Sequence, residues 1–80
     1  MIAVSSTTDL GAAIRKARKQ LGLTQSQLAM AAGAGVRFIG DLENGKPTVE
    51  LGRALTVIQA LGGVMTLMDM PLDEGQSHGA

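Results

Sequence analysis

Apolar residues near the start of the chain recur at the spacing of an amphipathic helix. Thr8 or Asp9 can cap the start of this helix, and Gly22 stands where a glycine usually ends one. The pattern predicts a helix from about residue 9 to residue 21, preceded by a flexible arm over residues 1–8. The apolar face, with intervals of three or four residues, consists of Leu10, Ile14, Ala17 and Leu21.

Two shorter helices are predicted next, separated by a tight glycine-containing turn. Residues 24–27, Thr-Gln-Ser-Gln, form a capping box in which the hydroxyl caps the first turn and the second glutamine reaches back. This helix ends near residue 33, and residues 33–35, Gly-Ala-Gly, make the turn. The next helix runs from about Val36 to Asn44, before Pro47. The inward-facing apolar residues of the two helices are Leu28, Ala29, Ala32, Ile39 and Leu42.

A fourth helix and a short strand complete the predicted elements. Thr48 can cap the helix, and the pair Gly62-Gly63 ends it. Leu51, Leu55, Ile58 and Leu61 line one face of this helix, which Ala54 and Val57 broaden. Residues 64–70 are too few for another helix and are predicted to form a strand closed by Pro71. The polar tail over residues 72–80 is predicted to be disordered.

A lone strand leaves unpaired backbone groups along both of its edges, so it needs a partner. The chain offers no second convincing strand, and the simplest supplier is another copy of the same chain. The alternative is an apolar segment that packs irregularly on the fourth helix. The sequence therefore predicts an all-α domain over residues 9–62 and a dimerisation strand over residues 63–71. The expected dimerisation residues are Val64, Met65, Thr66, Leu67 and Met68.

Charge is distributed unevenly along a chain whose net charge is zero. Residues 11–46 carry six basic and two acidic side chains, a net charge of +4, whereas residues 47–80 carry −3. This asymmetry favours nucleic acid as a ligand of the first half, although a solvated helix face is the simpler alternative. The absence of cysteine fits a reducing cytoplasm, and neither a signal peptide nor a membrane span is expected.

Catalysis is not expected from this composition. The only histidine, His78, lies in the tail, and the chain has no glycine-rich phosphate loop and no paired carboxylates on one helical face. No metal site and no cofactor are expected either. The methionines Met65, Met68 and Met70 suit packing in an adaptable interface.

The central segments match a known family at several points with the family's spacing. The sequence resembles the Cro/C1-type helix-turn-helix family over roughly residues 10–61, and this resemblance implies a lambda-repressor-like bundle that binds DNA. The flanking segments resemble HipB-like antitoxins, in which a C-terminal strand pairs across a dimer. The segments that carry the first resemblance are Leu21-Gly22-Leu23-Thr24-Gln25-Ser26-Gln27-Leu28-Ala29, Ala32-Gly33, Phe38-Ile39 and Asp41-Leu42-Glu43-Asn44-Gly45-Lys46-Pro47. Those that carry the second are Thr48-Val49-Glu50-Leu51, Val57-Ile58-Gln59-Ala60-Leu61 and Met65-Thr66-Leu67-Met68-Asp69.

The outer side of the predicted third helix supplies the candidate base-contacting residues, Val36, Arg37, Gly40 and Asp41. Arg37 can bind guanine O6 and N7 with both arms of its guanidinium, or it contacts phosphate only. Val36 offers apolar contact, for example to a thymine methyl group. Asp41 accepts a hydrogen bond from cytosine N4 or orients Arg37.

The candidate phosphate-contacting residues are Thr24, Gln25, Asn44 and Lys46. Gln25 lies in the first turn of its helix, where its amide and the helix N-terminus can meet a phosphate; the alternative is a surface glutamine. The resemblance implies that the turn holding Asn44 and Lys46 runs along the backbone, while Lys46 is otherwise a solubilising charge. Arg15, Lys16 and Lys19 add basic potential without a definite place on the DNA.

The resemblance assigns Arg18 and Glu43 a structural role. It aligns them with a partly buried ion pair that ties the first helix to the end of the third. The chain departs from the family pattern at Gly35, a weaker cap than serine or threonine, and at Val36 and Gly40. These departures reduce the expected hydrogen-bonded base contacts and increase the expected reliance on DNA shape.

The sequence thus predicts a homodimeric repressor that binds a palindromic operator. Its half-sites are expected roughly 34–36 Å apart, or a multiple of that distance. The resemblance implies an antitoxin that represses its own operon and holds a HipA-like serine/threonine kinase toxin inactive. The alternatives are a stand-alone or phage-type regulator and an interaction module that has lost DNA binding.

Overall fold

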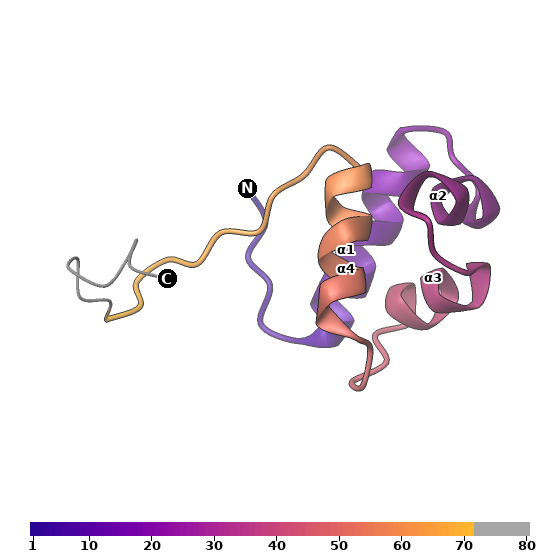
Figure 1. Ribbon diagram of the computed structural model, residues 1–80. Coiled ribbons are helices and arrows are strands. Elements are labelled where there is room, and N and C mark those ends of the chain that lie inside the picture. The colour runs from indigo at the N-terminus through magenta and orange to yellow at the C-terminus, as the bar shows by residue number, and fades with distance from the viewer. Residues whose placement is uncertain (72–80) are drawn as a thin grey trace.

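Four α-helices follow one another along the chain, and Figure 1 shows their arrangement in the computed structural model, which describes residues 1–71. They are α1 (Thr7–Gln20), α2 (Gln25–Ala32), α3 (Val36–Glu43) and α4 (Leu51–Ala60). Residues 1–71 contain no strand, and no helix among them is long and apolar enough to cross a membrane. The predicted all-α bundle of four helices is confirmed.

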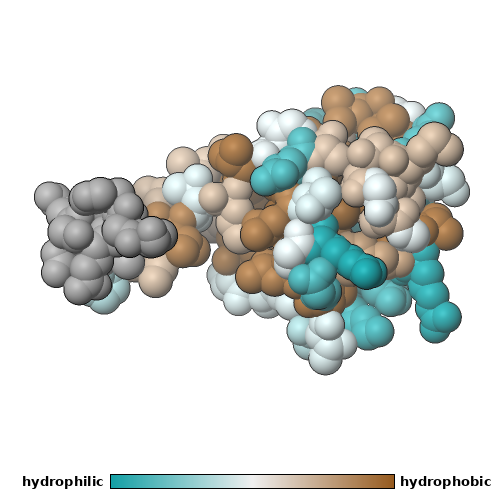
Figure 2. All heavy atoms as spheres, in the orientation of Figure 1, coloured by the Kyte–Doolittle hydropathy of each residue, from teal (hydrophilic) through white to brown (hydrophobic). Residues whose placement is uncertain are grey.

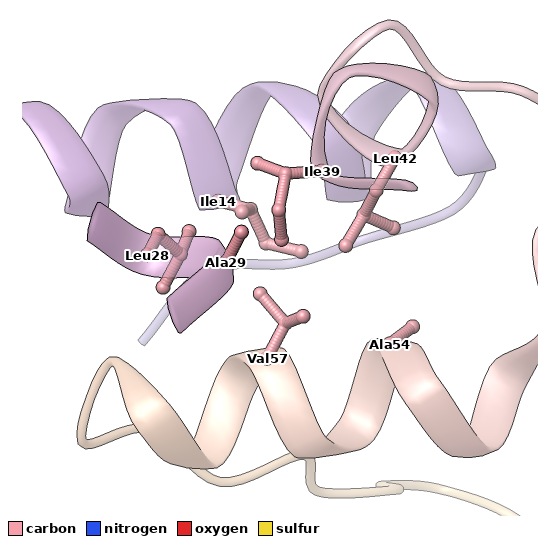
Figure 3. Close-up of a cluster of buried hydrophobic side chains, with 7 residues drawn as sticks. All are labelled: Ile14, Leu28, Ala29, Ile39, Leu42, Ala54 and Val57. Carbon is pink, nitrogen blue, oxygen red and sulfur yellow. The ribbon is translucent and has the colours of Figure 1, made fainter. Parts of the chain in front are cut away.

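The core lies where the four helices meet. Helix α3 packs against both α1 and α2, and α4 packs against α2. Figure 3 shows the side chains that fill the space between them, which come from all four helices. The buried cluster comprises Ile14, Leu28, Ala29, Ile39, Leu42, Ala54 and Val57. The inward positions predicted for Ile39 and Leu42 are therefore correct.

Helix α1 approaches the end of α3 so closely that only glycine fits at position 11. A Cβ atom there would lie 2.6 Å from the backbone oxygen of Glu43 and would also collide with the backbone oxygen of Leu42. The start of α1 is tied to the turn after α3 as well, because the Thr7 hydroxyl donates a 2.8 Å hydrogen bond to the Gly45 carbonyl. Backbone contact, rather than side-chain packing alone, sets the position of α3 on α1.

The cap of α1 differs from the expectation. Ser6, not Thr8 or Asp9, is the N-cap: its hydroxyl accepts a 3.0 Å hydrogen bond from the Asp9 amide. The Asp9 carboxylate in turn accepts a 3.0 Å hydrogen bond from the Ser5 amide. Helix α1 therefore begins earlier than predicted, because Ser6 satisfies one of the free amides of its first turn.

The caps of the central helices follow the sequence prediction. Thr24 and Gln27 form both hydrogen bonds of the capping box at the start of α2. Gly33 ends α2 with φ of 66°, a left-handed conformation that glycine adopts without steric cost. Gly35 is the N-cap of α3 and provides no side-chain hydrogen bond, as its lack of a side chain requires.

Helix α4 departs from the prediction at its cap and along its face. Glu50, not Thr48, is its N-cap, and the carboxylate accepts hydrogen bonds from the amides of Gly52 and Arg53. A carboxylate at the N-terminus of a helix also interacts favourably with the helix dipole. The residues predicted to broaden the face, Ala54 and Val57, are its fully buried centre, whereas Leu51 is 60% exposed. Leu21 of the predicted first-helix face is likewise exposed.

The predicted dimerisation segment leaves the bundle after Gly63 in an extended form. Val64, Met65, Leu67 and Met68 are all exposed in the single chain. Since the expected pairing is with a second copy, strand formation here stays a prediction. The tail predicted to be disordered, residues 72–80, lies outside the described residues.

Candidate nucleic-acid interface

The second and third helices form a helix-turn-helix unit whose outer side is α3. Ile39, Leu42 and Glu43 of α3 are buried, so residues 36, 37, 40 and 41 lie on the opposite side of the helix. Val36 and Arg37 are exposed, while Gly40 and Asp41 are half-buried. The structure thus brings the four candidate base-contacting residues together on one accessible helical surface.

A buried ion pair joins α1 to the end of α3. The Arg18 Nε donates to Glu43 Oε2 at 2.6 Å, and Arg18 Nη2 donates to Glu43 Oε1 at 3.0 Å. The remaining arm of the guanidinium, Nη1, donates to the Leu23 carbonyl at 2.8 Å. The two side chains are only 10% and 2% exposed. Such two-armed geometry fixes the relative orientation of the two helices.

The ion pair shifts the titration of both partners. Hydrogen bonding to Glu43 raises the pKa of Arg18 above its usual value and outweighs the opposing effect of burial. Burial raises the pKa of Glu43, but the hydrogen bonds from Arg18 and Gln25 and the charges of Arg18 and Arg15 together lower it. Both side chains are therefore held in their charged forms at neutral pH.

Gln25 is connected to this ion pair, a link that the sequence did not reveal. Its side-chain Nε2 donates a 3.1 Å hydrogen bond to Glu43 Oε1. The contact places the first turn of α2 beside the last turn of α3, next to Asn44 at the end of that helix. Two candidate phosphate-contacting residues from different helices are thereby brought to the same side of the molecule.

Asp41 and Lys46 also interact with each other. Lys46 Nζ lies 3.6 Å from Asp41 Oδ2, and both side chains are substantially exposed. Asp41 is therefore oriented toward Lys46 in the single chain, and its role at the DNA stays a prediction. Within residues 1–71, Arg37 takes part in no ion pair.

The remaining candidates lie at exposed positions around the unit. Thr24 is exposed at the N-cap of α2, and Asn44 is exposed at the C-cap of α3. Arg15 is exposed on α1, and its positive charge contributes to the lowered pKa of Glu43. The sequence did not predict this interaction of Arg15, because helical spacing alone does not define which neighbour an exposed side chain faces.

Helix α3 follows α2 after a short turn, presents one side to solvent, and is bordered by basic and amide side chains. This arrangement is that of a helix-turn-helix DNA-binding protein. A family model described as Helix-turn-helix matches residues 14–64. A curated relative, the uncharacterized HTH-type transcriptional regulator y4mF of Sinorhizobium fredii (strain NBRC 101917 / NGR234), is 49% identical over 59 residues. That match covers 74% of this chain and 78% of the relative.

Solved structures of HipB are similar to the whole bundle. A HipB-O4 20mer complex gives a TM-score of 0.80 at 33% identity and covers 86% of this chain and 97% of that one. A HipA-HipB-O2-O3 complex gives a TM-score of 0.79 at the same identity, with the same coverage. The chain belongs to the helix-turn-helix family and is a DNA-binding transcriptional regulator.

Proposed function

We propose that the chain is a homodimeric repressor in which each α3 enters a major groove of a palindromic operator. The accessible surface formed by Val36, Arg37, Gly40 and Asp41 supports this mode of binding. Arg37 reads guanine, because its guanidinium is exposed and no acidic side chain within residues 1–71 pairs with it. Val36 contributes apolar contact, and Gly40 lets the backbone of α3 approach the base edges.

The phosphate backbone is contacted on either side of α3. Thr24 and Gln25 act from the start of α2, and Asn44 and Lys46 act from the turn after α3. The hydrogen bond between Gln25 and Glu43 supports this assignment, since it holds the amide side chain beside the end of α3. Binding is expected to weaken steeply with added salt, because neutralised phosphates release counterions.

The biological role that we propose is that of a HipB-like antitoxin that represses its own operon in the cytoplasm. The observation that carries this proposal is the similarity to HipB over 97% of that chain, at 33% identity. One similar structure is a HipA-HipB-O2-O3 complex, which supports a HipA-like kinase toxin as the protein partner.

The direct test is to co-express this chain with the product of the adjacent reading frame, purify the two, and add DNA from upstream of the operon. A stable complex that retards this DNA, but not a shuffled sequence of equal length, is the expected result. A chain that retards the DNA but retains no partner would contradict the antitoxin role and leave the repressor role intact.

A second candidate is a stand-alone regulator without a toxin partner. The 49% identical relative, which is named only as a transcriptional regulator, favours this alternative. The same experiment separates the two roles, because both require DNA binding and only the antitoxin requires a retained kinase.

A further inference from the structure

Two apolar segments lie at the ends of the described chain, and neither contains a charged side chain. Residues 1–5 precede α1, and residues 64–68 follow α4. Figure 2 shows hydrophobic residues where the chain leaves the bundle, while most of the strongly hydrophilic residues in this view lie over the helical part. The exposed large apolar residues of the two segments are Met1, Ile2, Val4, Val64, Met65, Leu67 and Met68.

Each of the two segments is held to the bundle by a hydrogen bond close to the adjoining helix. The Ser5 amide donates a 3.0 Å hydrogen bond to Asp9 Oδ2, which anchors the N-terminal segment to the first turn of α1. The Gly63 amide donates a 2.9 Å hydrogen bond to the Ile58 carbonyl, which anchors the C-terminal segment to the last turn of α4. Both segments leave on the same side of the bundle in Figure 1.

The N-terminal segment, which the sequence pattern assigned to a flexible arm, is nevertheless compatible in composition with a short strand. Ile2 and Val4 are β-branched and alternate with Ala3 and Ser5, so that the two larger side chains would share one face. Residues 1–5 contain neither proline nor glycine, so the amides of residues 2–4 can donate to a neighbouring strand, while the Ser5 amide is bonded to Asp9. Ile2 is 63% exposed in the single chain, so its side chain contributes little to the stability of the monomer.

We propose that residues 1–5 of each copy form an outer strand of the dimerisation sheet. The inference rests on the proposed homodimer, in which residues 64–68 pair across a two-fold axis. A two-stranded ribbon is only marginally stable and leaves both outer edges open, whereas additional strands stabilise a sheet. Two N-terminal segments cover those two edges, and Ile2 and Val4 then pack into the interface with a second copy of the chain.

The test compares variants of the full chain by sedimentation equilibrium. The double variant Ile2→Asp/Val4→Asp is expected to raise the dimer dissociation constant by about tenfold or more, because it replaces two apolar side chains of the interface with carboxylates. Met30→Asp is the matched control: Met30 is 84% exposed on α2 and should leave the constant unchanged. Leu67→Asp is expected to dissociate the dimer through the central strand.

Amide hydrogen exchange distinguishes a strand from a merely apolar arm. The amides of residues 3 and 4 are expected to be protected in the wild-type dimer and to lose this protection in Leu67→Asp, whereas the Ser5 amide is bonded to Asp9 in the single chain and is left out of the comparison. A dimer that Leu67→Asp disrupts but that Ile2→Asp/Val4→Asp leaves intact, with unprotected amides at residues 3 and 4, would overturn this inference alone. A wild-type chain that is monomeric at every accessible concentration would overturn the proposed homodimer and the inference with it.

Discussion

At the end of the molecule that holds α2 and α3, called the helix-turn-helix end, the charged and polar side chains between helices find their hydrogen-bond partners within one chain. The terminal segments, residues 1–5 and 64–68, instead expose most of their apolar side chains. Arg18 and Glu43 form a buried two-armed pair, and no buried side-chain nitrogen or oxygen of the described residues lacks a hydrogen-bond partner. In contrast, Leu67 is 68% exposed on a segment that makes no strand in the single chain.

This difference indicates which part of the molecule is complete before it meets a partner. The surface around α3 is set in advance by the core and the ion pair, so DNA can bind to a preformed shape. The terminal segments gain their stabilisation only when another molecule covers them, because exposed apolar side chains contribute little to the stability of a monomer. The predictions below test this contrast, from the largest expected effect to the smallest.

The largest effect is expected from breaking the ion pair at the helix-turn-helix end. Arg18→Ala leaves the Glu43 carboxylate buried without its guanidinium, which should lower the free energy of unfolding by about 3–5 kcal/mol. Urea denaturation followed by circular dichroism measures the loss. Lys19→Ala, an exposed neighbour on α1, is the control and should change stability by less than about 0.5 kcal/mol. Equal losses in the two variants would contradict a structural role for the pair.

The next effect is expected at the close contact between α1 and α3. Gly11→Ala forces a Cβ against the backbone oxygens of Leu42 and Glu43, and overpacking of this kind should cost about 1–3 kcal/mol. Gly40→Ala is the matched control, because open space surrounds its Cβ position. Alanine should there stabilise α3 by up to about 1 kcal/mol through its helix propensity. Thermal unfolding of both variants should give shifts of opposite sign.

Binding specificity is expected to depend on Arg37 without any loss of stability. Arg37→Ala should weaken operator binding by about 1–3 kcal/mol while it changes binding to random DNA much less. Lys46→Ala, in contrast, should weaken binding to both DNAs alike, as expected for a phosphate contact. Fluorescence anisotropy with the two DNAs measures both losses, and an equal effect of Arg37→Ala on both would disprove base reading.

Acid should destabilise the helix-turn-helix end through Glu43. Because the pKa of Glu43 is lower in the folded chain than its usual value of 4.5, its contribution to stability is present above that pH. The contribution is lost as the pH falls through the folded-state pKa. The free energy of unfolding should therefore fall more steeply below about pH 4.5 in the wild type than in Glu43→Gln. Parallel pH profiles for the two proteins would contradict this linkage.

The smallest effect is expected at the exposed pair of Asp41 and Lys46. Asp41→Asn removes an ion pair of 3.6 Å between two accessible side chains, which should change stability by less than about 1 kcal/mol. The variant releases Lys46 for the phosphate backbone, so binding to random DNA should tighten slightly at low salt. Unchanged or weaker binding at low salt would show that Asp41 does not compete for Lys46.

Much of the helix-turn-helix unit could be predicted because its signals are local. The capping box of Thr24 and Gln27 and the left-handed Gly33 act within one or two turns of a helix, so neighbours along the chain decide them. The inward positions of Ile39 and Leu42 follow from helical spacing in the same way. The pairing of Arg18 with Glu43, 25 residues apart, came from family resemblance and not from local physics.

Where the sequence offered several possible caps for one helix, only the tertiary structure decided among them. Ser6 and Glu50 cap helices that Thr8 and Thr48 could equally have opened, and the Thr7 contact with Gly45 helps to fix the start of α1. The contacts of Gln25 with Glu43 and of Lys46 with Asp41 likewise join side chains that no spacing rule connects.

The sequence by itself determined the four helices, the turn between α2 and α3, and the side of α3 that is accessible. It did not determine which part of an apolar face becomes core: Leu51 and Leu21 share the predicted faces yet are exposed, while Ala54 and Val57 are buried. The physical reason is that helical periodicity defines the direction of a face. Only the packing of neighbouring helices determines how much of that face is covered.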